Sequence, residues 1–310
     1  MSSSVLPQVS QGDRIVSLDL LTYAGTLENL KPIESDPRHQ FVKGDIADPK
    51  LVRDLVREYR IDTIVNFAAE SHVDRSIAGA GPFVHTNVLG TVNLLDISRE
   101  NNLKFVQVST DEVYGSLGET GTFIETTPLA PNSPYSASKA AADCFVRSYH
   151  ETHKIWCVTT RCSNNYGPYQ FPEKFLPLSI TNLMRNKKIP LYGTGKNIRD
   201  WLHVEDHCEG IWLALTKGKS GEIYNFGGFG EKKNIDVAYE VLAAFSRKPD
   251  EGLDFVADRK GHDWRYSMDS TKAQNELGWK PRWSFEDGLK STLDWYKSNI
   301  AWWESKIPRR

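Results

Sequence analysis

The feature that most constrains the fold is an alternation of short apolar runs, rich in β-branched residues, with longer amphipathic stretches. Apolar strands that alternate with helices are typical of a parallel, doubly wound α/β sheet that is covered on both faces. In such sheets, ligands bind at the carboxyl ends of the strands. The predicted strands are 14–19, 39–45, 62–69, 104–110 and 156–161, and the predicted helices between them are 48–59, 83–100 and 135–153.

The rhythm changes after Arg161. Residues 163–200 are rich in Asn, Tyr, Pro and Gly. Further helices are predicted at 173–186, 235–247 and 284–299. We expect a cofactor-binding domain over 1–168 and a smaller α+β substrate-binding cap over 169–310, with about 203–230 returning to the first domain. This layout alone does not give a function.

Charge and composition exclude several classes of protein. The net charge of −2 provides no basic surface for nucleic acid or an anionic membrane. No apolar run is long enough for a membrane span, and the N-terminus does not resemble a signal peptide. The four cysteines form no CxxC pair, which favours free thiols in a reducing compartment. We therefore expect a cytoplasmic protein with no nucleic-acid or membrane partner.

The first chemical motif is STDEVYG, residues 109–115, at the end of a predicted strand. Adjacent carboxylates and a hydroxyl at this position suit acid/base chemistry. The motif alone fits equally well a polar strand exit with solvated acids.

The second motif is YSASK, which places Tyr135 and Lys139 four residues apart on one face of a predicted helix. An ammonium group beside the phenol would lower the pKa of the tyrosine and make it a usable general base. The alternative is an amphipathic helix with an exposed Tyr–Lys pair, because this spacing is common by chance.

Together, STDEVYG and PYSASKAAAD resemble the extended short-chain dehydrogenases/reductases, which have a Rossmann-like fold and use NAD. The resemblance extends from about Arg14 to the C-terminus. It includes FAAESHVDRS, CSNNYGPYQFPEKFLP, YGTGKNIRDWLHVEDH, DRKGHDWRY and LGWKPRWSFEDGL. So many ordered motifs make chance similarity negligible.

Within that family, the Asp-Glu pair after Thr110 resembles the nucleotide-sugar 4,6-dehydratases rather than the epimerases or decarboxylases. RDWLHVEDH and HDWRY are similar to the enzymes that act on dTDP-glucose. The resemblance implies a lyase reaction: oxidation at C4, elimination of water across C5 and C6, and return of the hydride to C6. It implies that Tyr135 is the base at the 4-hydroxyl, Lys139 tunes it and Thr110 binds the C4 oxygen. Glu112 would remove the C5 proton and Asp111 would protonate the departing hydroxyl.

The resemblance also implies two sets of binding residues and a homodimer formed through the helices at 83–100 and 135–153. Besides Tyr135 and Lys139, residues matching NAD-binding positions are Asp19, Leu20, Leu21, Thr22, Asp45, Ile46, Ala68, Ala69, Ser71, Thr86 and Asn165. Residues matching nucleotide-sugar positions are Ser71, Thr110, Asn164, Lys174, Phe175, Pro190, Tyr192, Arg199, Asn234, Asp258, Arg259 and His262.

His203 and His207 are four residues apart and could share a metal ion on one helix face. No third ligand is evident, and we interpret the segment as a capped helix start with Glu205 and Asp206 in its first turn. We therefore expect no metal.

The chain departs from the family at its N-terminus. The usual first strand and GxxGxxG loop, which bind the cofactor pyrophosphate, have no counterpart before Gly25. SVLPQVSQGDR resembles instead the end of the first helix and the turn into the next strand. We expect two neighbouring strands to lack a partner. The hypothesis follows that the chain as written binds NAD poorly and is unstable.

Two alternative functions remain open. One is another nucleotide-sugar epimerase or decarboxylase of the same family, against which the Asp111–Glu112 pair argues. The other is an inactive nucleotide-sugar-binding remnant, which the missing glycine loop favours and the intact catalytic residues disfavour.

Overall fold

The computed structural model of the chain describes residues 12–307. Its central sheet consists of four parallel strands in the order β3–β4–β5–β9. The register places Phe105 opposite Cys157 and Thr159 opposite Ile223. The strands are β3 (Thr63–Asn66), β4 (Lys104–Thr110), β5 (Cys157–Cys162) and β9 (Ile223–Phe226).

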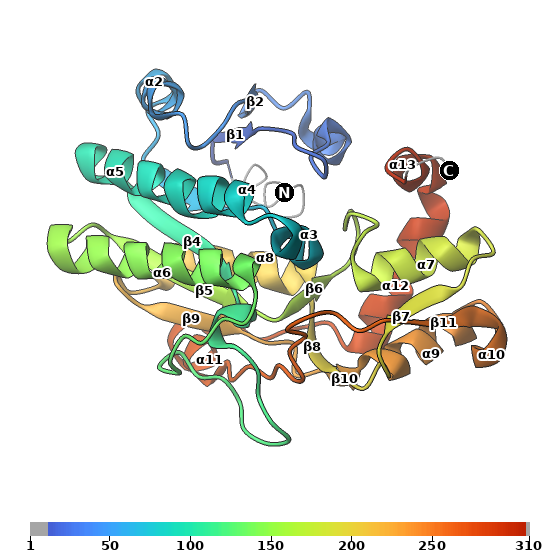
Figure 1. The fold of residues 1–310 in the computed structure, drawn as a ribbon. Coiled ribbons are helices and arrows are strands. Elements are labelled where there is room, and N and C mark those ends of the chain that lie inside the picture. The colour runs from blue at the N-terminus through green and yellow to red at the C-terminus, as the bar shows by residue number, and fades with distance from the viewer. Residues whose placement is uncertain (1–11, 308–310) are drawn as a thin grey trace.

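Helices cover both faces of this sheet, in agreement with the burial of every residue of β5. On one face lie α2 (Pro49–Tyr59), α5 (Thr91–Asn101) and α6 (Pro134–His153), and on the other lie α8 (Val204–Lys217) and α11 (Thr271–Leu277) (Figure 1). Neighbouring residues of β5 alternate between the two cores. Cys157 packs among side chains of α2, α5 and α6, whereas Val158 packs with Ala214 of α8 and Leu277 of α11. The predicted α/β class is confirmed.

A separate parallel pair, β1 (Ile15–Asp19) and β2 (His39–Lys43), lies above the central sheet in the view of Figure 1. Among the described strands, β1 pairs only with β2, and β3 pairs only with β4. The expected break in the sheet is therefore present between them. The 3-10 helix η1 (Leu27–Ile33) packs its Leu30 and Ile33 against this pair in a small cluster.

The second half of the chain forms a smaller α+β region. One sheet joins β10 (Glu231–Lys233), β8 (Ile198–His203) and β6 (Asn164–Tyr166), and another pairs β11 (Leu253–Val256) with β7 (Ile189–Tyr192). Apolar side chains from these strands and the surrounding helices form the largest core cluster. The helices are α7 (Phe175–Met184), α9 (Asn234–Ala244), α10 (Pro249–Gly252), α12 (Phe285–Ser298) and α13 (Ile300–Glu304).

All of the predicted strands and helices are present, with shifted ends. Asp48 caps α2 through Lys50 N and Leu51 N, and Pro49 occupies the first turn as expected. The predicted helix at 83–100 is composite: α4 (Gly81–Phe83) leads into the π-helical η2 (Val84–Gly90) and then α5. The short helices α3 (Val73–Ala78) and η3 (Asp111–Tyr114) were not predicted. The predicted helix end within residues 4–11 lies outside the described residues.

Candidate active site

A tight turn at the end of β4 directs the two predicted acids inward. Thr110 caps η3, because its Oγ1 accepts a hydrogen bond from Glu112 N at 3.3 Å. The same hydroxyl donates to Asp111 Oδ1 at 3.1 Å. Gly115 ends the turn with φ of +86°, and a Cβ there would lie 2.4 Å from Ala130 O. A larger residue could not pass this close to the neighbouring backbone.

Asp111 is buried and Glu112 is partly buried, which argues against a polar strand exit with two solvated acids. Asp111 is 2% exposed, and its burial together with the charge of Glu112 holds its pKa well above the usual range. Burial also raises the pKa of Glu112, while the positive charges of Lys174 and Arg199 oppose that rise. Asp111 therefore favours the protonated form, as an acid that donates a proton requires.

Tyr135 and Lys139 lie one turn apart on the buried side of α6. The helix begins at Pro134 after Ser133, whose side chain forms a reciprocal capping box with Ser136. Tyr135 is 9% and Lys139 3% exposed, so the alternative of an exposed pair is wrong.

The ammonium of Lys139 donates to Val108 O at 2.7 Å. Burial, and then the charge of Glu112, raise the pKa of Tyr135 well above its usual value. The lowering of this pKa predicted from Lys139 is therefore absent from the structure. The reason is that the enclosed phenol faces two carboxyl groups, while a hydrogen bond with Thr110 favours the phenolate only in part.

The predicted adenosine-side residues lie at the ends of β1 and β2, where they are more open. Asp19 follows β1, and its Oδ1 accepts a hydrogen bond from Leu21 N at 2.7 Å. Asp45 Oδ2 lies 3.0 Å from His85 Nε2, and its Oδ1 accepts from Ala47 N. Leu20 is 43% exposed. The two carboxylates thus occupy the strand ends, as ribose-binding acids would.

The other predicted cofactor-side residues come from the following strand ends. Ala68, Ala69 and Ser71 follow β3, and Thr86 lies in η2. Asn165 of β6 is fixed from within: its Oδ1 lies 2.9 Å from His207 Nδ1, and its Nδ2 donates to Ser163 O at 3.0 Å. His207 was not predicted as a site residue.

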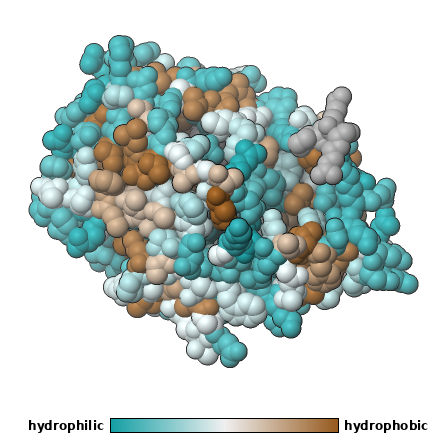
Figure 2. Space-filling model, viewed as in Figure 1, coloured by the Kyte–Doolittle hydropathy of each residue, from teal (hydrophilic) through white to brown (hydrophobic). Residues whose placement is uncertain are grey.

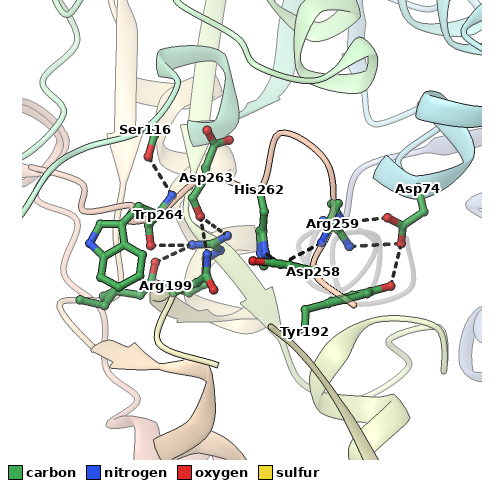
Figure 3. Close-up of polar contacts among 11 residues, drawn as sticks. Asp74, Ser116, Tyr192, Arg199, Asp258, Arg259, His262, Asp263 and Trp264 are labelled. Carbon is green, nitrogen blue, oxygen red and sulfur yellow. Dashed lines mark hydrogen bonds and ion pairs between the residues drawn. The ribbon is translucent and has the colours of Figure 1, made fainter. Parts of the chain in front are cut away.

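Three cations approach the acids from the substrate side. The ammonium of Lys174 donates to Ser71 O at 2.8 Å, and its charge acts on Glu112. The guanidinium of Arg199 donates to Asp263 O at 2.9 Å (Figure 3). It also stacks over the Tyr266 ring, 4.3 Å from the ring centroid. The charge of Arg259 also reaches Glu112. These positive charges would favour the binding of a ligand's anionic groups near the two acids.

Four predicted substrate residues form one cluster in Figure 3, together with an acid that sequence reasoning missed. His262 Nδ1 lies 2.7 Å from Asp258 Oδ1, and Arg259 stacks over Tyr192 with 5.2 Å to the ring centroid. The unpredicted member is Asp74, which binds both Arg259 and Tyr192. Its only sequence signal was its place in the motif FAAESHVDRS.

The remaining predicted substrate residues are spread over the same region. They lie on β6, at the start of α7, on β7 and at the start of α9, and are Asn164, Phe175, Pro190 and Asn234.

The segment with His203 and His207 is a capped helix start, as interpreted. His203 is the residue before α8, and its Nδ1 accepts from Glu205 N at 3.4 Å, with Glu205 and Asp206 in the first turn. The His203 ring also stacks on Trp283, with 4.3 Å between ring centroids.

Between residues 12 and 307 no helix has the length and apolar character needed to cross a membrane.

The chain is similar in sequence and in structure to several known proteins. The family model described as GDP-mannose 4,6 dehydratase matches residues 6–292. A dTDP-glucose 4,6-dehydratase from Xanthomonas campestris pv. campestris is 51% identical, over 96% of this chain and 90% of that protein. The crystal structure of the dTDP-glucose 4,6-dehydratase from Bacillus anthracis in complex with NAD is 47% identical, with a TM-score of 0.93 over 99% of this chain and 96% of that one. The Streptomyces venezuelae enzyme, also with NAD bound, is 48% identical, with a TM-score of 0.94 over 98% and 96% of the two chains.

Proposed function

Because the chain belongs to the dTDP-glucose 4,6-dehydratases, within the broader GDP-mannose 4,6-dehydratase family, we propose that it converts dTDP-glucose to dTDP-4-keto-6-deoxy-glucose. The observation that carries the proposal is the pair of adjacent acids near Tyr135, with Asp111 buried and Glu112 partly buried. Asp111, with its raised pKa, and Glu112, facing three cations, form a proton donor and a proton acceptor in one turn. Epimerisation requires neither of them, since no water is eliminated.

The cofactor is NAD. The nicotinamide side of the site fits it: Tyr135, Lys139 and Thr110 converge at the end of β4, where the buried Ser109 Oγ and Asp111 Oδ2 have no hydrogen-bond partner within residues 12–307. Bound NAD supplies the hydride acceptor and donor. The adenosine side offers Asp19 and Asp45, while the described part of the chain contributes no glycine-rich turn for the pyrophosphate.

The residues divide the proton transfers among them. Tyr135 accepts the proton of the sugar 4-hydroxyl, and Thr110 holds the oxygen that then becomes a carbonyl. The carbonyl acidifies C5–H, and Glu112 removes that proton. Asp111 donates its proton to the departing C6 hydroxyl. Because Tyr135 has a raised pKa here, it can act as a base only when nearby positive charge favours its phenolate.

The binding residues predicted above complete the proposal. Lys174, Arg199 and Arg259 hold the diphosphate, with Tyr192, Asp258 and His262 around Arg259. The domain division is at about residue 168, with 203–230 in the cofactor half. The pairing of β9 with β5 and the packing of α8 on that sheet support this return.

We also propose a homodimer and a cytoplasmic location. Val84 and Leu89 of η2 and Phe145 of α6 are 54%, 51% and 40% exposed, although all are apolar. Figure 2 shows hydrophobic surface gathered over the side of the molecule that carries η2, α5 and α6. A second copy of the chain would cover it. Cys144, Cys157, Cys162 and Cys208 are free thiols, which suits a reducing compartment.

The test is to incubate the purified chain with dTDP-glucose and NAD and to measure the alkaline absorbance of a 4-keto-6-deoxy product. Product formation that is lost in Tyr135→Phe supports the proposal. Epimerised or decarboxylated product would identify a sister enzyme instead. A thermal shift with dTDP but neither a shift with NAD nor product would identify a binding remnant.

A further inference from the structure

Asp74 connects two elements that carry proposed substrate residues. Its Oδ1 accepts a hydrogen bond from Arg259 Nε at 2.7 Å, and its Oδ2 accepts from Arg259 Nη2 at 3.2 Å. The same Oδ2 accepts from the Tyr192 hydroxyl at 3.2 Å. Figure 3 shows the carboxylate reaching both partners from α3, across from the loop that carries Arg259. One carboxylate thus fixes two side chains from a different part of the chain.

The backbone beneath Arg259 is held independently of Asp74. Val256 of β11 lies opposite Tyr192 of β7, and Gly193 N donates to Val256 O at 3.0 Å. Asp258 then accepts from Arg259 N at 2.8 Å. Loss of the Asp74 carboxylate would therefore free the guanidinium while leaving the loop in place.

The pairing leaves the other end of the guanidinium available. Asp74 occupies Nε and one side of Nη2, and Nη1 has no hydrogen-bond partner among the described residues. The charge of Arg259 acts on both Glu112 and Lys174, so the guanidinium lies near the site. An arginine held along one edge by a carboxylate can offer its remaining N–H groups to a phosphate in a fixed direction.

We propose that Asp74 is a positioning residue for the nucleotide diphosphate. It holds Arg259 and Tyr192 in their binding orientation before the ligand arrives. This inference rests on the proposed function, because it assumes that the ligand is a nucleotide diphosphate sugar. Asp74 is not one of the proposed catalytic residues. A side chain fixed before binding loses less conformational freedom when the ligand arrives, so its removal weakens affinity rather than chemistry.

The test measures dTDP binding by calorimetry and turnover of dTDP-glucose in the full chain, for the wild type and Asp74→Asn. We expect the Kd for dTDP and the KM to rise roughly 10-fold and kcat to stay within about 2-fold. The matched control is Asp36→Asn, because Asp36 binds Arg38 through the same atoms, Nε at 3.0 Å and Nη2 at 2.7 Å, away from the site. The control should bind dTDP as the wild type does.

A double-mutant cycle shows whether Asp74 acts through Arg259. In an Arg259→Gln background, Asp74→Asn should weaken dTDP binding by no more than about 2-fold. Equal losses in both backgrounds, or unchanged or tighter binding by Asp74→Asn alone, would overturn the proposal. If the melting temperature of Asp74→Asn is lower than that of Asp36→Asn, Asp74→Glu serves as a second variant because it keeps the charge. Asp74→Glu must then restore dTDP binding at least in part. If the wild type itself does not bind dTDP, the proposed function fails first.

Discussion

The two sides of the proposed cofactor site are built very differently. At the catalytic side, every residue of β5 is buried, and α6 packs against β4 and β5. At the adenosine side, Ser17 is the one buried residue of β1, and the local cluster contains only Leu30 and Ile33 as buried members. Chemistry that depends on shifted pKa values needs the enclosed side. The open side can contribute contacts to a ligand but little perturbation of its own groups.

A few contacts attach the open side to the rest of the molecule. The Tyr23 hydroxyl donates to Glu173 Oε1 at 2.8 Å, and Arg75 stacks over the Tyr23 ring at 3.6 Å. Trp302 Nε1 donates to Asn29 Oδ1 at 3.0 Å. Polar contacts of this kind hold a layer in place without the apolar burial that makes a region resist local opening.

The largest effect should come from the enclosed side. Tyr135→Phe removes the hydroxyl of the proposed base but keeps the aromatic ring, so we expect kcat to fall about 10³-fold. The Kd for dTDP should stay unchanged, because the phenol is not among the diphosphate residues. Tyr149→Phe is the control on the same helix, where the hydroxyl binds Asp96 at 2.9 Å instead. Turnover of Tyr135→Phe within tenfold of the wild type would remove Tyr135 from the mechanism.

Stability should separate the two sides next. Arg161 and Asp143 form a buried pair at 2.9 Å, with side-chain exposures of 4% and 2%. Arg161→Met leaves a buried carboxylate without its partner, so we expect a loss of about 3–5 kcal/mol in the free energy of unfolding. Arg38→Met breaks the exposed pair with Asp36 and should leave the denaturation midpoint unchanged. Similar midpoints for the two variants would contradict the contrast between the two sides.

Acid sensitivity should also come from the enclosed side. Burial lowers the pKa of His207 to about 4, below its unfolded value of 6.5. The folded state thus favours the neutral ring. The contribution of this ring to the free energy of unfolding is complete above pH 6.5, and it is lost as the pH falls toward 4. The shift corresponds to about 3 kcal/mol.

Urea denaturation from pH 7 to pH 4 should show this slope in the wild type and a shallower one in His207→Gln. His39 of β2 is less enclosed, and burial lowers its pKa as well. His39→Gln should therefore change the slope by a smaller amount. An equal effect of both substitutions would mean that the open side is as protected as the enclosed side.

Periodicity predicted the fold well because the signals that set it are local. The apolar run at 104–110 and the capped, proline-started helices follow from short stretches of sequence. The strands β6–β11 were harder to predict, because all of them except β8 have only three or four residues and such short strands depend on pairing with distant partners. The π-helical turn in η2 likewise had no signal in the sequence.

The sequence indicated which residues of the proposed site lie near one another, but it did not indicate their electrostatics. The sequence placed Tyr135 and Lys139 on one helix face, and they share it. It could not show that Lys139 donates to Val108 O while Tyr135 faces the acids, because those contacts join α6 to β4. Asp74 was missed for the same reason: its partners Tyr192 and Arg259 are 118 and 185 residues away along the chain.

The smallest effect should come from the open side, where Asp19→Asn tests the adenosine contact. Asparagine keeps the side-chain oxygen that accepts from Leu21 N, so the turn after β1 is retained while the charge is lost. A charge-assisted hydrogen bond to a ribose hydroxyl would become a neutral one, so the Kd for NAD should rise roughly 5-fold. Calorimetry with NAD measures this, and dTDP binding should not change. If the Kd for NAD is unaltered while dTDP binds normally, Asp19 does not contact the ribose. The carboxylate at the end of β1 would then contribute nothing to the affinity for NAD.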